Sequence, residues 1–251
     1  MTISQYLIAL VGGLLAGLIN AVAGGGTLVS FPILLSIGLR PIDANITNTI
    51  SLVLGYAGGA YSQRKSLGSF RGKLTAWIIV AGLGGIFGSF LLRLMSEKVF
   101  ESIVPLLIFV ACALLACQGF LKRLIFTKAH RSTGRELLIL ITIFLSATYG
   151  GYFGAGLGII LMSILGLTFN EGIKEINSLK AVLSFAINIC AASFLIFSGN
   201  IHWNLVFIMS ISSLTGGLIG GKIVHKIRPE ILKTLLIVFG IAVGIKMLTN
   251  V

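Results

Sequence analysis

Long apolar stretches separated by short basic segments make up almost the whole chain. The first stretch covers residues 6–39 without a charged side chain, and it is longer than the roughly 20 residues that one membrane helix needs. Gly24, Gly25 and Gly26 lie near its middle, and Pro32 follows them. An interior glycine costs a helix about 1 kcal/mol relative to alanine, and a proline costs about 3 kcal/mol. The pattern therefore predicts two short membrane segments separated by a break at the three glycines.

The same pattern recurs in the second half of the chain. Residues 137–167 form another long uncharged stretch, with the glycine-rich segment 150–158 near its middle. A second pair of short membrane segments is therefore predicted there. The remaining apolar stretches predict full membrane helices at 43–61, 74–92, 99–121, 171–199, 205–221 and 231–248.

An internal duplication explains this recurrence. Glu171 follows the second glycine-broken stretch as Asp43 follows the first, and Asn177-Ser178 then matches Thr47-Asn48 after an insertion of two residues. We therefore interpret the chain as a single integral membrane domain, 1–251, with repeat one at 1–121, a basic loop at 122–136 and repeat two at 137–251.

Composition supports a membrane protein and excludes several other classes. Hydrophobic residues make up 56% of the chain, charged residues 10%, and the mean hydropathy is +1.05, which is not the composition of a soluble domain. The apolar stretches are continuous and lack the alternation of a β-barrel. The net charge of +12 does not indicate nucleic-acid binding, because the basic residues lie between apolar stretches, as in cytoplasmic loops of membrane proteins.

Sequence motifs for cofactors, metals or catalysis are not found. Cys112, Cys117 and Cys190 lie inside apolar stretches without the CxxC spacing of metal or redox sites. The segment 154–158 lacks the preceding strand and the following lysine of a phosphate-binding loop. No nucleophile–base pair indicates an enzyme. The N-terminus has no basic region before its apolar stretch, so a cleaved signal peptide is not favoured.

The distribution of basic residues predicts how the two repeats are oriented. Segments 62–75, 119–137 and 222–228 are rich in Lys and Arg, whereas 198–204 has neither, so the positive-inside rule places the first three in the cytoplasm. Five membrane-entering segments in each half satisfy this rule. The predicted fold is an all-α membrane protein of two inverted repeats, each with a glycine-broken pair of short membrane segments plus three full transmembrane helices. Crossing segments and re-entrant hairpins both stay open for the broken pairs.

Inverted repeats with broken helices are a common plan of secondary transporters, with the substrate site near the membrane midplane. Lys180 is the most informative residue for such a site. It lies about nine residues inside its helix, or roughly 13 Å at 1.5 Å per residue, which is close to the middle of a hydrocarbon core about 30 Å thick. A charge there costs about 2.5–3.5 kcal/mol, so we interpret Lys180 as facing an anion. A snorkelling lysine or a buried ion pair is the alternative.

The glycine breaks expose backbone N–H groups, and the N-termini of the following half-helices point at the breaks. A helix N-terminus carries about half a positive charge and binds anions. This interpretation makes candidate ligands of Gly24, Gly25, Gly26, Thr27, Gly154 and Gly156. The alternative is close helix packing, which accounts well for isolated glycines elsewhere, namely Gly84, Gly85, Gly88, Gly216, Gly217, Gly220 and Gly221.

Neutral polar side chains in the helices that follow the breaks complete the predicted site. An oxyanion needs several hydrogen-bond donors and little formal charge if it is to be held and then released. The candidates are Asn45, Thr47, Asn48, Asn177, Ser178 and Asn188. Hydrogen bonds between helices, worth about 0.6 kcal/mol each, are the alternative role for these side chains.

These residues carry a resemblance to the TauE/SafE family, also called the sulfite exporter or TSUP family, over essentially the whole chain. The matching positions in the first half are Gly24-Gly25-Gly26, Pro32, Gly38-Leu39-Arg40-Pro41 and Ala44-Asn45-Ile46-Thr47-Asn48. Those in the second half are Gly151, Phe153, Gly154, Gly156, Asn177, Lys180, Asn188, Ser193, Gly199 and Trp203. Ile160 departs from the pattern, since it stands where the first half has Pro32. The resemblance implies transport of small organosulfur anions, sulfite and sulfonates among them.

The sequence therefore predicts a secondary transporter of a small anion in the inner, or plasma, membrane, working by alternating access. Its expected partners are the anionic substrate, the lipid bilayer and a coupling ion, because no ATP-binding motif is present; uniport is the alternative to ion coupling. Neither a cofactor nor a nucleic acid is expected. A permease for another small anion or a neutral solute, and a non-transporting membrane subunit, are the alternative functions.

Overall fold

The computed structural model of the chain describes residues 1–70, 72–126, 135–169, 171–198, 201–223 and 229–249, and the regular secondary structure of these ranges is entirely helical. Two short 3-10 helices, η1 (Arg64–Ser66) and η2 (Gly68–Phe70), follow α3. In chain order the α-helices are α1 (Ile3–Val22), α2 (Thr27–Ser36), α3 (Pro41–Gln63), α4 (Leu74–Leu94), α5 (Glu97–Phe126), α6 (Arg135–Tyr152), α7 (Leu157–Thr168), α8 (Ile173–Leu195), α9 (Trp203–Ile223) and α10 (Pro229–Thr249).

Both predicted breaks are present, and each follows a helix that ends in the same way. The amides of Ala23 and Gly24 both donate to the carbonyl oxygen of Ile19, at 2.7 and 2.9 Å. In the second half the amides of Phe153 and Gly154 likewise share the carbonyl of Tyr149, at 3.0 and 3.2 Å. The glycine that ends each helix has a positive φ, 81° for Gly24 and 75° for Gly154, a conformation that glycine adopts without steric cost.

The first broken pair is a hairpin whose ends return to the same side. Near the start of α1, Nε2 of Gln5 donates to the carbonyl oxygen of Ile37, just past the end of α2, at 3.2 Å. At the other end of the pair, the amide of Gly26 donates to Oδ1 of Asn20 at 2.7 Å. The two helices are therefore antiparallel. The first broken pair is thus a helical hairpin, in which α2 is much shorter than α1.

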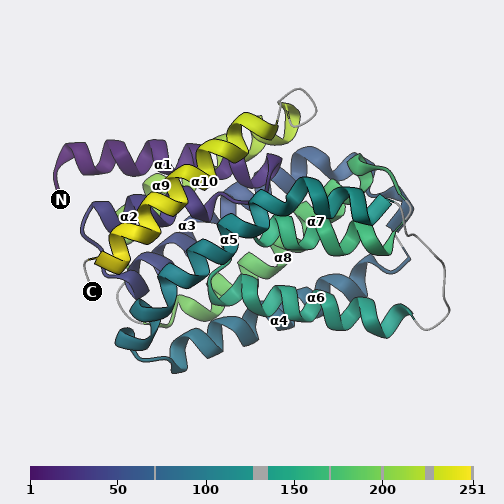
Figure 1. Cartoon of the computed structure of the whole chain (residues 1–251), viewed down its shortest axis with the longest axis horizontal. Coiled ribbons are helices and arrows are strands. Elements are labelled where there is room, and N and C mark those ends of the chain that lie inside the picture. Colours follow the sequence, from purple (N-terminus) through teal and green to yellow (C-terminus); the bar gives the residue numbers. More distant parts are fainter. Residues whose placement is uncertain (71, 127–134, 170, 199–200, 224–228, 250–251) are drawn as a thin grey trace.

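The packing of the helices has a matched pattern in the two halves. α1 packs along α9, and α6 packs along α4; α3 packs on α8 and on α9, while α8 packs on α3 and on α4. α5 packs against α10 and α7. In Figure 1, α1, α9 and α10 lie along the upper side of the molecule, α4 and α6 along the lower side, and α3, α5, α7 and α8 between them.

Glycines close these helix contacts, as the packing interpretation predicts. A Cβ on Gly84 of α4 would lie 2.6 Å from Cβ of Ala147 on α6, and a Cβ on Gly220 of α9 would lie 2.7 Å from the carbonyl oxygen of Leu18 on α1. Small residues at such crossings let helix backbones approach each other closely inside a membrane. The glycines of α4 and α9 therefore belong to the packing of the bundle.

The two ends of the molecule carry different connections. Lys73 before α4 forms an ion pair with Glu136 at the start of α6, and η1 lies beside α8; we call this the basic end. At the opposite end the turns between α2 and α3 and between α4 and α5 meet through Arg40 and Glu97, at 3.0 Å. The predicted basic segments around 127–134 and 224–228 lie outside the described residues.

Lipid-facing surface and helix length fit a multi-pass membrane protein. Within the described ranges, five helices are long and apolar enough to span a membrane, namely α1, α4, α5, α8 and α9. Large apolar side chains such as Ile79, Leu106 and Ile211 are more than half exposed on the outside of the bundle. α3 is as long as α8, but its many polar residues lower its hydropathy, and those residues form much of the candidate site.

Candidate functional site

The two glycine breaks cross each other inside the bundle. The amide of Gly158, in the first turn of α7, donates to the carbonyl oxygen of Gly24 at 3.1 Å. A Cβ on Gly24 would overlap Cα of Gly158, and a Cβ on Gly26 would overlap the carbonyl oxygen of Ala16 on α1. Gly156 has a positive φ of 75°. Close packing and backbone geometry therefore account for Gly24, Gly26 and Gly156, which the sequence had suggested as ligands.

Each break leaves backbone amides without a partner. In the first break the amides of Gly25 and Thr27 have no hydrogen-bond acceptor in the part of the chain that the structure describes, and in the second the same holds for the amides of Ala155 and Gly156. All four residues are buried. Because an unpaired buried amide is costly and rare in folded proteins, both breaks are places where water or a ligand can be bound.

Side chains around the first break add further donors. Asn20 accepts from the amide of Gly26 through its Oδ1, which leaves its Nδ2 buried and without a partner among the described residues. The hydroxyl of Tyr56, on α3, lies near the side chains of Thr27 and Asn20, and Nδ2 of Asn20 still lacks a hydrogen bond. The first break is therefore lined by groups that can donate hydrogen bonds to an anion.

Lys180 lies beside the same break. Its side chain is only 2% exposed, so it does not snorkel to the membrane surface. Its Nζ lies 3.5 Å from the carbonyl oxygens of Asn20 and Ala21, in the last turn of α1. A cation is favoured at the C-terminal end of a helix, and both contacts have the greatest length at which a hydrogen bond still forms. The ammonium thus lies at the break without being tightly held by these two carbonyls.

A corresponding contact ties α3 to the end of α6. Nδ2 of Asn45 donates to the carbonyl oxygen of Tyr152 at 2.9 Å. Counted from the first residue of each helix, Asn45 and Asn177 are both fifth, while Asn48 and Lys180 are both eighth. The match of Asn177 with Thr47 proposed from the sequence differs from this helix count by two residues. The reason is that Asp43 is the third residue of α3, whereas Glu171 lies two residues before α8 begins. The insertion of two residues assumed from the sequence covers only half of this shift of four.

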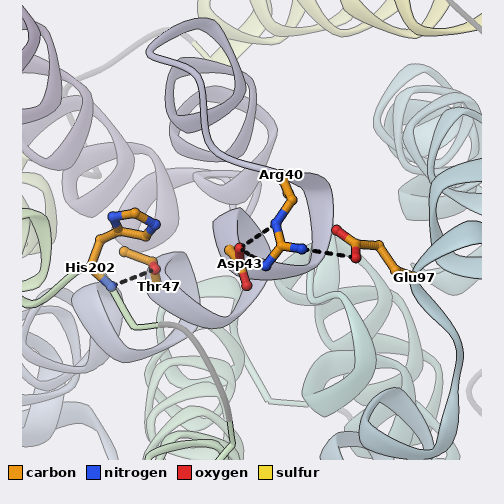
Figure 2. Close-up of polar contacts among 5 residues, drawn as sticks. All are labelled: Arg40, Asp43, Thr47, Glu97 and His202. Carbon is orange, nitrogen blue, oxygen red and sulfur yellow. Dashed lines mark hydrogen bonds and ion pairs between the residues drawn. The ribbon is translucent and has the colours of Figure 1, made fainter.

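Other predicted site residues have partners away from the breaks. Thr47 accepts from the backbone amide of His202 at 3.4 Å (Figure 2). Asn177 donates to Oε1 of Gln63 near the basic end, and the hydroxyl of Ser178 donates to the carbonyl of its own helix four residues earlier at 2.9 Å. The alternative role that the sequence left open, hydrogen bonding within the bundle, is the one observed for these three. The Oδ1 atoms of Asn48 and Asn188 are buried without a partner among the described residues.

A charged cluster at the end opposite the basic end was not predicted. Arg40 donates from Nε to Oδ2 of Asp43 at 2.9 Å and from Nη1 to Oε2 of Glu97 at 3.0 Å (Figure 2). The hydrogen bond and charge of Asp43, followed by the charge of Glu97, raise the pKa of Arg40 above its ordinary value. Asp43 borders two cavities of about 490 and 230 Å³. The first is lined by Arg40 and His202 and the second by Arg93 and Ser198, among others.

Comparison with known proteins decides the family. The family model of the sulfite exporter TauE/SafE matches residues 9–247 of this chain. The chain belongs to the TauE/SafE family. Membership in a family of membrane transporters favours transport over catalysis for this TauE/SafE protein. It also agrees with the five candidate spans within its described residues.

Relatives of this TauE/SafE protein have names of the same kind. The probable membrane transporter protein ORF9 of Sinorhizobium is 24% identical over 241 residues, which cover 96% of this chain and 91% of the relative. A probable membrane transporter protein of Haemophilus influenzae is 26% identical over 245 residues, covering 94% and 91%. The probable membrane transporter protein YfcA of Escherichia coli is 22% identical over 241 residues, covering 94% and 86%. This TauE/SafE protein is therefore similar to probable membrane transporter proteins along nearly its full length.

Two residues of this TauE/SafE protein that its sequence pattern did not single out as ligands also lie at the breaks. Asn20 and Tyr149 lie in the last turns of α1 and α6, and the hydroxyl of Tyr149 donates to the carbonyl of Ala155 at 2.6 Å. Both are polar side chains inside uncharged apolar stretches. Since polar groups at membrane depth are costly and usually have a function, that position was the available signal.

Proposed function

We propose that this protein moves a small oxyanion, sulfite or an organosulfur anion such as a sulfonate, across the membrane by alternating access. The observation that carries the proposal is the set of donors at the first break. They are the unpaired amides of Gly25 and Thr27 and the unpartnered Nδ2 of Asn20, with the ammonium of Lys180 beside the last turn of α1. The family name supports sulfite as the first anion to test.

The physical chemistry of these donors suits a transported anion. The N-terminal end of α2 favours negative charge, and Lys180 supplies the formal charge that balances it. The remaining donors are neutral, so they bind the oxygens of an oxyanion without holding it irreversibly. The Nζ of Lys180 lies 3.5 Å from the carbonyls of Asn20 and Ala21, so its charge is placed beside the first break.

Two inverted repeats, 1–121 and 137–251 with the basic loop 122–136 between them, form the second part of the proposal. Three features support it. α1 and α6 end with the same pair of hydrogen bonds, the packing of α1 on α9 is matched by that of α6 on α4, and α3 and α8 have equal length. Repeats of this kind place the substrate site at their interface, which is where the breaks cross.

Transport is tested in liposomes that contain the purified protein. We expect uptake of sulfite by the wild type and a loss of at least tenfold in Lys180→Met, which keeps most of the side-chain volume but removes the charge. Lys174→Met is the matched control, because Lys174 lies on the same helix and is exposed; its uptake should equal that of the wild type. Uptake of a neutral solute in preference to any anion would replace the proposed substrate, and the absence of flux with every solute would support a non-transporting subunit.

Opposite orientations of the repeats are tested separately, by labelling of single cysteines in a background without Cys112, Cys117 and Cys190. Ser66 and Lys222 are predicted to face the cytoplasm, and Ser102 and Asn204 the other side. An impermeant thiol reagent added from outside should label only cysteines at 102 and 204. Labelling of 204 and 222 from the same side would contradict the inverted arrangement.

A further inference from the structure

The two breaks both have unpaired backbone amides, but the side chains beside them differ, with acceptors beside the second where the first has donors. A carbonyl oxygen can only accept, so the bond from Nδ2 of Asn45 to Tyr152 determines which way the Asn45 amide points. Its Oδ1 is then left buried and without a partner in the described structure. At the first break the amide of Asn20 is determined in the opposite sense, because a backbone N–H of Gly26 can only donate to it.

A second unpartnered oxygen lies on the same helix. Asn48 follows Asn45 by three residues on α3 and therefore shares its face of the helix. The side chain of Asn48 is 1% exposed and that of Asn45 is fully buried. Oδ1 of Asn48 also lacks a partner among the described residues. A buried acceptor without a donor is unfavourable, so two such acceptors one helical turn apart form a place where a donor or a cation can bind.

The other half of the molecule identifies that group. Asn48 occupies in α3 the place that Lys180 occupies in α8, since each is the eighth residue of its helix. Lys180 holds its ammonium against the last carbonyls of α1, while α3 is joined to the last carbonyl of α6 by Asn45. The C-terminal end of α1 therefore has the ammonium of Lys180 beside it, and the C-terminal end of α6 has amide oxygens at the corresponding place.

We propose that a small monovalent cation binds at this place, between the Oδ1 atoms of Asn45 and Asn48 and the last turn of α6. Neutral oxygens and helix C-terminal carbonyls are the ligands that discontinuous transporter helices use for Na⁺. A divalent ion is disfavoured because Ca²⁺ and Mg²⁺ sites rely on carboxylates, and the proposed ligands are all neutral. Such a site would supply the coupling ion for transport, but it does not depend on which anion is carried.

The test uses purified full-length protein in detergent without any organosulfur anion, so its result is independent of sulfite transport. Thermal unfolding is measured in NaCl, LiCl and KCl, each against N-methyl-D-glucamine chloride at equal ionic strength. We expect at least one alkali cation to raise the Tm of the wild type by several degrees in a saturable manner. Asn48→Leu should weaken the apparent cation affinity at least tenfold. Asn177→Leu, which alters the buried amide at the counterpart of Asn45, should keep the full response.

Two further variants make the test decisive in both directions. Asn48→Lys supplies the ammonium covalently and should unfold at the same temperature with and without alkali cations. Asn48→Asp adds a negative charge and should bind the cation more tightly than the wild type, even if Asn48→Leu fails to fold. The proposal is overturned if no alkali cation stabilises the wild type, or if Asn48→Lys and Asn48→Asp respond to cations as the wild type does.

Discussion

The two glycine breaks have the same backbone but different side chains beside them. At both, the preceding helix ends with two amides on one carbonyl and a glycine at positive φ. Around the first break lie donors, namely Nδ2 of Asn20 and the ammonium of Lys180. Around the second lie acceptors, the Oδ1 atoms of Asn45 and Asn48. A repeated backbone thus carries two different chemistries, because side chains can change without moving the crossing that positions them.

The difference between the two breaks arises because their backbones must fit each other closely, whereas the side chains beside them need not be alike. The crossing of Gly24 over Gly158 leaves no room for a Cβ, so the backbone of each break depends on the other. The side chains that surround them touch mainly helix ends, whose free amides and carbonyls accept partners of several kinds. This leaves the side chains beside each break free to differ, as the proposed anion and cation sites require.

The largest expected effect is on the crossing itself. Gly24→Ala adds a methyl group that overlaps Gly158 and also forces alanine into a positive φ, which together should lower the free energy of unfolding by at least ~3 kcal/mol. Gly38→Ala is the control, because Gly38 has a φ of 98° but nothing within 4 Å of its Cβ position. It should lose only about 1–2 kcal/mol. Equal losses for both variants, measured by thermal unfolding in detergent, would show that the close crossing of Gly24 and Gly158 contributes nothing to stability.

Lys180→Met comes next and distinguishes an anion ligand from a structural cation. If Lys180 serves the substrate, removal of its charge relieves a desolvation cost of about 2.5–3.5 kcal/mol, and the protein without substrate should be as stable as the wild type or more so. It should also lose the stabilisation that saturating sulfite gives the wild type, about 2.7 kcal/mol at a hundredfold excess over Kd. A decrease of about 3–5 kcal/mol, as for a broken buried ion pair, would assign Lys180 to structure alone.

A smaller effect separates the two asparagines. Asn20→Leu leaves the buried amide of Gly26 without its acceptor and should lower the free energy of unfolding by about 1–3 kcal/mol. Asn45→Leu frees only the carbonyl of Tyr152 and also removes an unpartnered oxygen, so its loss should be below about 1 kcal/mol, since unpaired carbonyls are tolerated better than unpaired amides. Denaturation of both variants under the same conditions measures the difference. A larger loss for Asn45→Leu would reverse the assignment of side-chain donors and acceptors to the two breaks.

The smallest effect is expected at Arg40. Its side chain is 53% exposed, and ion pairs with this much solvent contribute little and are screened by salt. Arg40→Gln should change the Tm slightly at low salt and not measurably at high salt. Since Arg40 stays charged throughout the accessible pH range, its contribution should be the same from pH 6 to pH 9. A large, salt-independent loss would show that the cluster of Arg40, Asp43 and Glu97 holds the fold together.

Much of the fold was predictable because it depends on local sequence. Gly24 and Gly154 marked the breaks, since few other residues end a helix at positive φ without cost. Glycine stripes on α4 and α9 predicted close helix contacts. Lys180 stood out as a charge far inside an apolar helix, and it lies at the first break. Thr47, Asn177 and Ser178 were chosen by the same reasoning from neutral polar residues, yet their partners lie elsewhere in the bundle.

The sequence by itself determined which segments enter the membrane, where two of them break and which loops carry positive charge, because hydropathy, helix propensity and loop charge are properties of neighbouring residues. Only the tertiary structure decided which buried polar group faces which. Asn45 bonds to Tyr152 and Lys180 to Asn20, residues more than 100 positions apart, and a hydrogen bond exists only where two groups come within about 3 Å in a suitable direction. Such pairs determine which side-chain donors and acceptors surround each break, so this environment depends on the packing of the two halves together and not on either half alone.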